Sequence, residues 1–271
     1  MSGFWCEYPR DTVRVAGPDA LTYLQSQISQ DIRGLGDRES AYSFVLQPMG
    51  KIEALVRIVR HSAEEFVLDT DPGFGEIVVA RLNRFKIRVK VDIEPLASRC
   101  IAVRNADVPK LSGVQAWGLV DAFDITGSSP QAPAGVRAGS VDELLAARIE
   151  AGWPAMGHEI TDTSIPAETG VVALAVNFTK GCYPGQELVE RMDSRGSQAP
   201  RFVRRLRGAG PVAVGVEVLR ETAVVGHITS VASSGELWVA LAPLARSAQP
   251  GDTVSVGSCH DVVVELARPD S

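Results

Sequence analysis

Residues 177–192 read NFTKGCYPGQELVERM, and they place one cysteine between a lysine-glycine pair and a proline-glycine pair. Pro184 presets the backbone for a turn and Gly185 tolerates a positive φ, so CYPG predicts a tight turn with Cys182 at its entrance. The following QELVERM is helix-like, because its apolar residues recur at helical spacing. The sequence therefore places the Cys182 thiol close to the N-terminus of a helix.

The setting of Cys182 is compatible with two interpretations, the first of which is a reactive thiol. A helix N-terminus and the nearby Lys180 both stabilise a thiolate, which makes sulfur more nucleophilic and better able to hold soft metals or iron-sulfur clusters. The alternative is a small apolar residue tucked under a turn, the common fate of a free cysteine. The other cysteines, Cys6, Cys100 and Cys259, are far apart and form no CxxC pair. This spacing argues against a zinc knuckle, and we assign no metal ligands.

The composition is that of an ordinary globular protein, with 45% hydrophobic and 22% charged residues in a chain of 271. The longest apolar run, VVALAV at 171–176, is far shorter than the roughly 20 residues of a membrane-spanning helix. The N-terminal residues lack the basic start and apolar stretch of a signal peptide. We therefore expect a cytoplasmic protein with no membrane partner.

The charge pattern argues against direct nucleic acid binding. The net charge of −6 disfavours attraction to phosphates. The arginine-rich stretch RFVRRLR at 201–207 alternates charged and apolar residues, which is more typical of a half-exposed strand or a linker than of a nucleic acid site.

Strand and helix signals are mixed through the first two thirds of the chain. In EFVLDTDPGFGEIVVARLNRFK, Asp71 is placed to cap a helix and Pro72 to occupy its first position. In SVDELLAARIEAG, Ser140 and Glu143 have capping-box spacing, and Gly152 stops the predicted helix. From about residue 201 onward, short β-like runs alternate with glycine and polar turns, which predicts a small β-barrel. The fold class we predict is α+β with a C-terminal β-barrel.

Three stretches carry a family resemblance: RIEAGWP at 148–154, IPAET at 165–169 and FTKGCYPGQELVER at 178–191. Together they are similar to the YgfZ-type folate-binding proteins, the bacterial relatives of mitochondrial iron-sulfur assembly factors. Weaker agreement extends over nearly the whole chain. The family hallmark K-G-C-Y-x-G-Q-E is matched here by Lys180, Gly181, Cys182, Tyr183, Gly185, Gln186 and Glu187.

The resemblance implies a three-domain ring like that of the glycine cleavage T-protein, with two interwoven α+β domains and the C-terminal barrel. In the related fold the first domain is discontinuous. We accordingly expect a first, folate-binding domain at 1–45 and 127–200, a second at 46–126 and the barrel at 201–271. The cofactor implied is tetrahydrofolate or another reduced folate, bound in a central channel with the cysteine motif nearby.

The function that the resemblance implies is maturation or repair of iron-sulfur proteins, including enzymes that thiolate tRNA. Cys182 and Lys180 are then the residues that act chemically. The partners are folate and iron-sulfur client or assembly proteins. A single thiolate cannot satisfy a cluster that usually needs four ligands, so any cluster must be shared with another molecule or handled transiently.

Three residues are candidates for folate contacts. Glu150, in RIEAG, matches the T-protein glutamate that holds the pterin ring; a carboxylate can accept two N–H bonds from such a ring. Without the resemblance Glu150 reads as a polar-face helix residue. Arg191 either holds the folate carboxylates or pairs with Glu187. Tyr183 can stack on a pterin, although aromatic residues near a motif are more often core.

Two other functions remain open. The first is a tetrahydrofolate-dependent aminomethyl or methyl transferase. Where that family has N-x-x-G-G-x-x-D-D, this chain has QPMGKIEAL, with Ala54 and Leu55 in place of the aspartates. Glu53 lies on the opposite strand face from position 54, and we therefore do not expect an active aminomethyltransferase. The second is a non-catalytic protein-binding scaffold, which predicts an unreactive Cys182.

Overall fold

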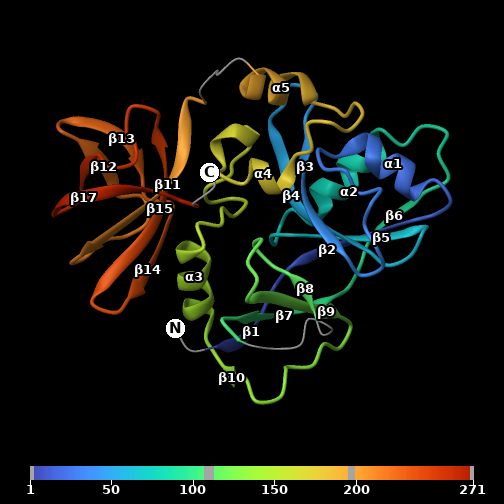
Figure 1. Cartoon of the computed structure of the whole chain (residues 1–271), viewed down its shortest axis with the longest axis horizontal. Coiled ribbons are helices and arrows are strands. Elements are labelled where there is room, and N and C mark those ends of the chain that lie inside the picture. The colour runs from blue at the N-terminus through green and yellow to red at the C-terminus, as the bar shows by residue number, and fades with distance from the viewer. Residues whose placement is uncertain (1–2, 107–112, 195–198, 269–271) are drawn as a thin grey trace. The chain divides into compact units, whose positions relative to one another are not determined.

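The structure is a computed structural model and describes residues 3–106, 113–194 and 199–268. The chain divides into two compact units, Met1–Val141 with Leu174–Gln186 and Asp142–Ala173 with Glu187–Ser271 (Figure 1). No helix in the described ranges is long and apolar enough to cross a membrane. The three-domain boundaries stay a prediction, and the one between residues 45 and 46 falls inside a strand.

The first unit contains a five-stranded sheet in the order β3-β4-β5-β2-β6. Strand β4 is buried along almost its whole length, as expected for a strand covered on both faces. Its Ala54, Val56 and Ile58 belong to the apolar core that the sheet shares with helices α1 and α2. The elements are β2 (Asp11–Ala16), α1 (Ala20–Gln27), β3 (Ser40–Leu46), β4 (Ile52–Arg60), β5 (Glu65–Thr70), α2 (Gly75–Arg84) and β6 (Asp92–Pro95).

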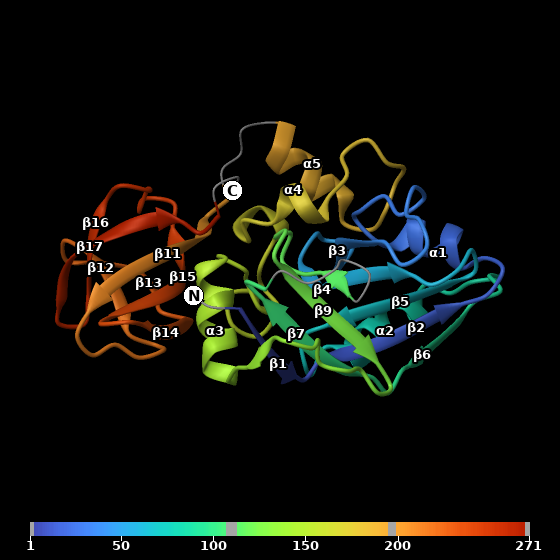
Figure 2. The ribbon, with the colours of Figure 1, turned by 60° about the horizontal axis from the view of Figure 1, so that its bottom comes forward.

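The same unit contains a second sheet in the order β10-β1-β7-β9-β8. Figure 2 shows β7 and β9 lying over β4 and β5. The strands are β1 (Phe4–Tyr8), β7 (Arg99–Arg104), β8 (Val114–Gln115), β9 (Ala122–Gly127) and β10 (Arg137–Ala138).

Buried charges join the two sheets. Arg57 of β4 is 1% exposed; its Nε lies 2.9 Å from Asp69 Oδ2, and its Nη1 lies 2.8 Å from Asp124 Oδ2 on β9. Arg104 Nη2 lies 2.9 Å from Asp124 Oδ1. Arg10 lies 2.8 Å from Asp69 and also pairs with Asp71. Residues Arg10, Arg57, Arg104, Asp69, Asp71 and Asp124 form what we call the inter-sheet ion cluster, in which three positive charges face three negative ones.

Helix α2 begins later than the sequence predicts. Its first residue is Gly75 rather than Pro72, and its cap is not Asp71, whose carboxylate pairs with Arg10. Instead Asp11 of β2 accepts hydrogen bonds from the Gly73 and Gly75 N–H groups, at 2.8 and 2.9 Å. A distant carboxylate therefore satisfies donors that the local sequence assigned to Asp71.

The second unit includes most of α3 (Val141–Glu150) and the short 3-10 helix Pro166–Glu168. The predicted stop of α3 is confirmed: Gly152 has φ of +62°, and a Cβ there would lie 1.9 Å from the Ala267 carbonyl oxygen. Two further helices, α4 (Val172–Ala175) and α5 (Gln186–Ser194), each span a boundary between the units.

The C-terminal strands close into a barrel, and the predicted α+β class with a C-terminal barrel is confirmed. The ring runs β11-β17-β16-β12-β13-β15 and is closed by pairing of β15 with β11, while β14 is added to β15. RFVRRLR lies in β11, so of its two predicted structures, a half-exposed strand or a linker, the strand is observed. The strands are β11 (Arg201–Ala209), β12 (Glu217–Arg220), β13 (Ala223–His227), β14 (Ser230–Ser234), β15 (Leu237–Ala245), β16 (Thr253–Val256) and β17 (Cys259–Leu266).

Candidate functional site

The cysteine motif contains a tight turn that begins one residue later than predicted. The N–H of Gln186 donates to the carbonyl of Tyr183 at 3.3 Å, so the turn spans Tyr183 to Gln186. Pro184 and Gly185, which has φ of +86°, occupy its central positions, as a type II turn requires. Cys182 precedes the turn and is exposed, and helix α5 begins directly after it. The thiol is thus presented to solvent just before a helix N-terminus.

Close packing fixes the turn against the β3–β4 loop. A Cβ on Gly185 would lie 2.7 Å from the Gln47 carbonyl oxygen and 3.0 Å from the Gly50 Cα. Any residue other than glycine would therefore push the turn away from that loop. Tyr183 is buried, and its N–H donates to the Gln186 side chain at 3.3 Å.

Lys180 anchors the other end of the motif. Its ammonium is buried and donates to the carbonyl oxygens of Gln25, at 2.6 Å, and Ile28, at the C-terminal end of α1. A cation in this place satisfies carbonyls that the helix leaves unpaired and faces the negative end of the helix dipole. The ammonium also lies 5.0 Å from the centre of the Tyr183 ring, within cation–π range. Lys180 therefore ties the motif to α1.

Burial lowers the pKa of Lys180 to about 8, while the charge of Asp31 raises it and that of Arg33 lowers it. Unfolding restores the ordinary value of 10.5, so between about pH 8 and 10.5 the unfolded chain binds more protons than the folded one. We therefore expect the free energy of unfolding of the wild type to rise with pH in this window, relative to that of Lys180→Met. Urea unfolding of both proteins from pH 7.5 to 10 measures the difference, with exposed Lys51→Met as control. Parallel curves for wild type and Lys180→Met would contradict the assignment.

The remaining motif residues are accessible to different degrees. Gly181 and Glu187 are exposed, and Gln186 is half-buried at the first position of α5. Arg191 is exposed on the same helix, and in the described part of the chain no ion pair joins it to Glu187. Of its two predicted roles, pairing with Glu187 is therefore not seen, and a contact with folate stays a prediction.

Glu150 lies at the C-terminal end of α3, in the second unit, where Arg207 of β11 holds its carboxylate. Arg207 Nη1 donates to Glu150 Oε1 at 2.7 Å, and Nη2 donates to Oε2. Arg205 donates to the Glu150 main-chain carbonyl at 2.8 Å. This bidentate pairing is the kind predicted between Glu150 and a pterin ring, but here the guanidinium of Arg207 is the partner. The role of Glu150 in folate binding stays a prediction.

The stretch that matches the T-protein aspartates is apolar or already paired. Ala54 and Leu55 are buried in β4. Glu53 Oε2 lies 3.1 Å from Arg81 Nε of α2. Burial raises the pKa of Glu53, while the charge of Arg81 lowers it. Its carboxylate is therefore committed to an ion pair within the first unit.

The other cysteines have settings unlike that of Cys182. Cys6 and Cys100 are buried, and Cys259 is half-buried with its Sγ donating to the Ala209 carbonyl. Burial raises the pKa of the Cys100 thiol above its usual range. Within the described residues no group of three or more His, Cys, Asp and Glu side chains is placed to hold a metal ion.

Sequence reasoning missed the partners of the site residues. RFVRRLR predicted a strand but did not identify Arg207 as the partner of Glu150, because strand pairing determines which helix end it meets. Sequence reasoning also missed Gln25 and Ile28 as partners of Lys180. Their main-chain carbonyls accept the bonds, and a main-chain contact does not depend on the residue type.

The fold is shared with a solved structure of known class. Glycine cleavage system aminomethyltransferase T from Bartonella henselae matches with a TM-score of 0.78 at 16% identity, over 98% of this chain and 85% of that one. The chain thus has the T-protein fold. No protein-family profile matches it.

Several curated proteins are similar to this chain in sequence. A tRNA-modifying protein YgfZ from Edwardsiella ictaluri is 26% identical over 228 residues, 73% of this chain and 68% of the relative. A mitochondrial iron-sulfur cluster assembly factor IBA57 homolog from Mycosarcoma maydis is 28% identical over 225 residues, 72% of this chain and 54% of the relative. An uncharacterized Haemophilus influenzae protein is 26% identical over 88% of both chains. The chain is a homologue of the YgfZ and IBA57 proteins, as the resemblance predicted.

Proposed function

We propose that this protein is a folate-binding accessory factor that supports iron-sulfur cluster assembly or repair, including that of enzymes of tRNA thiolation, with Cys182 as its working thiol. The observation that carries the proposal is an exposed cysteine on an anchored loop. Lys180 ties one side of that loop to α1, and Gly185 packs the other side against the β3–β4 loop. The names of the YgfZ and IBA57 homologues support the same function.

The geometry suits a thiol that acts on a partner rather than one that stabilises the fold. An exposed sulfur can ligate iron of a cluster in transit, and the rigid loop lowers the entropy lost on forming that bond. Cys182 supplies one of the four ligands that a cluster usually needs, so the client or another thiol must supply the rest. Lys180 contributes by positioning the loop, because its ammonium is bonded to α1.

Glu150 is our candidate anchor for the folate ring. Its carboxylate already accepts two parallel N–H donors from Arg207, and a pterin presents a similar pair through its amino group and adjacent ring nitrogen. The two acceptor oxygens of Glu150 therefore fit the pterin donors once Arg207 is displaced. When bound, tetrahydrofolate would supply one-carbon units carried on its ring nitrogen N5 and its bridging nitrogen N10.

This exchange predicts opposite effects for the two partners. Glu150→Ala should abolish binding of tetrahydrofolate, whereas Arg207→Ala should tighten it about fivefold, because the competing ion pair is removed. Anaerobic calorimetric titration measures both affinities. Arg205→Ala is the matched control, since Arg205 lies on the same strand and pairs with Glu265, but it donates to the main-chain carbonyl of Glu150 and not to its carboxylate. Unchanged binding in Glu150→Ala, or weaker binding in Arg207→Ala, would count against this anchor.

The two alternative functions have less support. Aminomethyl transfer requires a carboxylate that Ala54 and Leu55 do not provide, and Glu53 is paired with Arg81. A scaffold without chemistry predicts an unreactive Cys182, whereas this thiol is exposed.

A further inference from the structure

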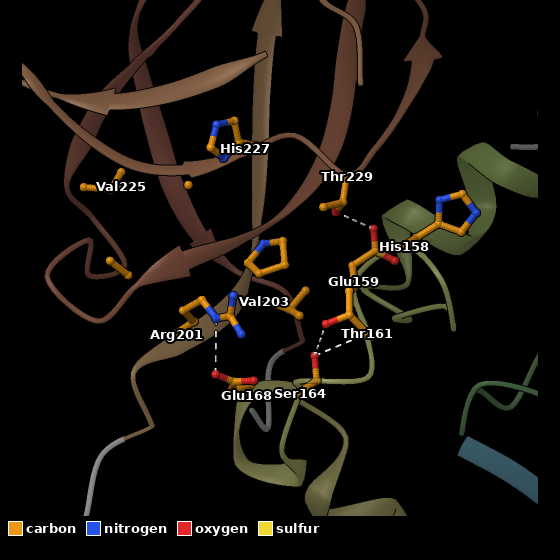
Figure 3. Close-up of a pocket in the computed structure, with 13 residues that line it drawn as sticks. His158, Glu159, Thr161, Ser164, Glu168, Arg201, Val203, Val225, His227 and Thr229 are labelled. Carbon is orange, nitrogen blue, oxygen red and sulfur yellow. Dashed lines mark hydrogen bonds and ion pairs between the residues drawn. The ribbon is translucent and has the colours of Figure 1, made fainter. Parts of the chain in front are cut away.

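A pocket of about 250 Å³ lies within the second unit, and its lining includes neither the cysteine motif nor Glu150. Its walls come from residues 158–168 and from the barrel strands β11, β13 and β15. Figure 3 shows Glu168 and Arg201 at one end, His227 at the opposite end, and Glu159 and Thr229 along one side. Neither the proposed folate anchor nor the thiol uses this pocket.

Glu159 is already fully engaged by the protein. Its side chain is completely buried; Oε2 accepts bonds from Arg148 at 2.8 Å and the Ala155 N–H at 3.0 Å. Oε1 accepts the hydroxyl groups of Thr229 and Ser230, at 2.7 and 2.6 Å. This carboxylate therefore joins the 155–160 loop to the barrel, and it has little capacity left for a ligand cation.

Arg201 has donors to spare. Its Nε lies 3.3 Å from Oε1 of the buried Glu168, whose Oε2 accepts the Ile165 N–H at 3.2 Å. Within the described residues the two terminal amino groups of Arg201 have no hydrogen bond or ion pair, and 44% of its side chain is exposed. Glu168 thus binds the Arg201 guanidinium at Nε. The two terminal amino groups, which we call the Arg201 fork, keep their N–H donors for a ligand. The Arg201 fork therefore offers unused N–H donors to this pocket.

The wall beside Arg201 is apolar. Val203 and Val225 are buried, and Pro243 and Ala245 complete the surface. Gly226 belongs to the same wall, and a Cβ there would lie 2.6 Å from the Pro243 carbonyl oxygen. The pocket therefore combines one fixed guanidinium with a short aliphatic surface.

We propose that this pocket binds a small organic anion, whose carboxylate is held by the Arg201 fork and whose short branched apolar body packs on Val203 and Val225. The observations favour a carboxylate over phosphate, because the apolar wall leaves few partners for the additional phosphate oxygens. Ligands of about six non-hydrogen atoms bind in the millimolar range at best when one ion pair dominates. The proposal is independent of the folate anchor and of Cys182, so the failure of either leaves the other intact.

Chemical-shift titration of the full ¹⁵N-labelled chain at low ionic strength tests this. The probes are isobutyrate, its uncharged isostere isobutyramide, and inorganic phosphate. We expect isobutyrate to saturate the amide shifts of the pocket residues, with isobutyramide at least about tenfold weaker. Arg201→Gln should weaken isobutyrate binding by a similar factor. The matched control is Arg220→Gln, because Arg220 belongs to the same barrel, is 43% exposed and pairs with Asp252.

Several outcomes would overturn the proposal: no saturation by isobutyrate, equal binding of isobutyrate and isobutyramide, or saturation by phosphate alone. Equal weakening by Arg201→Gln and Arg220→Gln would show that only overall charge matters, and would also overturn it. The isobutyramide comparison uses the wild type, so the proposal stays testable even if Arg201→Gln fails to fold.

Discussion

Replacing Cys182 by alanine should abolish the support of iron-sulfur enzymes while leaving the fold intact. The side chain is exposed, so the expected change in unfolding free energy is within about 0.5 kcal/mol. Activity should fall to the level of cells that lack the protein, because no other thiol lies on the anchored loop of residues 177–186. The readouts are the activity of an iron-sulfur enzyme and the thiolation of tRNA in such cells carrying either variant.

Cys259→Ala is the matched control for this experiment. Cys259 is half-buried on the barrel and donates to a main-chain carbonyl, so its loss should leave the support of iron-sulfur enzymes unchanged. A thiol reagent added to the folded protein should react with Cys182 well before the buried Cys6 and Cys100. Full support by Cys182→Ala in cells would refute the proposed role, whatever the reactivity of the thiol.

The largest loss of stability should follow replacement of Asp124 by asparagine. Arg57 and Arg104 both bind this carboxylate, and Tyr8 donates its hydroxyl to it at 2.9 Å. Removing the charge leaves two buried guanidinium groups with less compensation, which typically costs about 3–5 kcal/mol. Urea unfolding at pH 7 measures the loss. A variant as stable as the wild type would show that the inter-sheet ion cluster does not depend on this charge.

An exposed ion pair between the strands of the same sheet provides the control. Glu7 of β1 pairs with Arg99 of β7 at 2.7 Å, with both side chains about half exposed. Water screens such a pair, so Glu7→Gln should change the stability very little. The contrast between Asp124→Asn and Glu7→Gln therefore separates the effect of burial from that of charge.

Acid should lower the free energy of unfolding through the same carboxylate, that of Asp124. Burial alone would raise the pKa of Asp124, but the charges of Arg104, Arg57 and Arg10 lower it to about 2. Because the folded value lies below the ordinary 3.8, the carboxylate stabilises the fold above pH 3.8, and this contribution is lost as the pH falls toward 2.

The sequence predicted features that are encoded locally. Spacing alone indicated the turn near Cys182, helix α5, the stop of α3 at Gly152 and the β-rich tail. The glycine at 185 was identified as a turn residue, although its contact with the β3–β4 loop depends on chain far from it. These predictions succeeded because backbone preferences within a few residues determine the outcome.

Long-range partners were not predictable in the same way. The cap of α2 comes from Asp11 rather than Asp71, and the partner of Glu150 is an arginine in a strand read only as half-exposed. The inter-sheet ion cluster did leave a signal. Arg57 lies between the apolar residues Val56 and Ile58 of β4, and Asp124 is the one charged residue of β9. Opposite charges with apolar neighbours in two strands can therefore be searched for as pairs.

The attachment of Lys180 to α1 has a consequence for protein synthesis. Gln25 and Ile28 leave the ribosome 155 and 152 residues before the lysine that binds their carbonyls. At about 5–20 residues per second, the first unit must wait roughly 8 to 30 seconds for its last segment. During that wait the carbonyls of Gln25 and Ile28 lack the bonds that Lys180 later donates. The loop that carries Cys182 is therefore the segment whose arrival completes the unit, so the thiol is presented only by chains that have finished folding there.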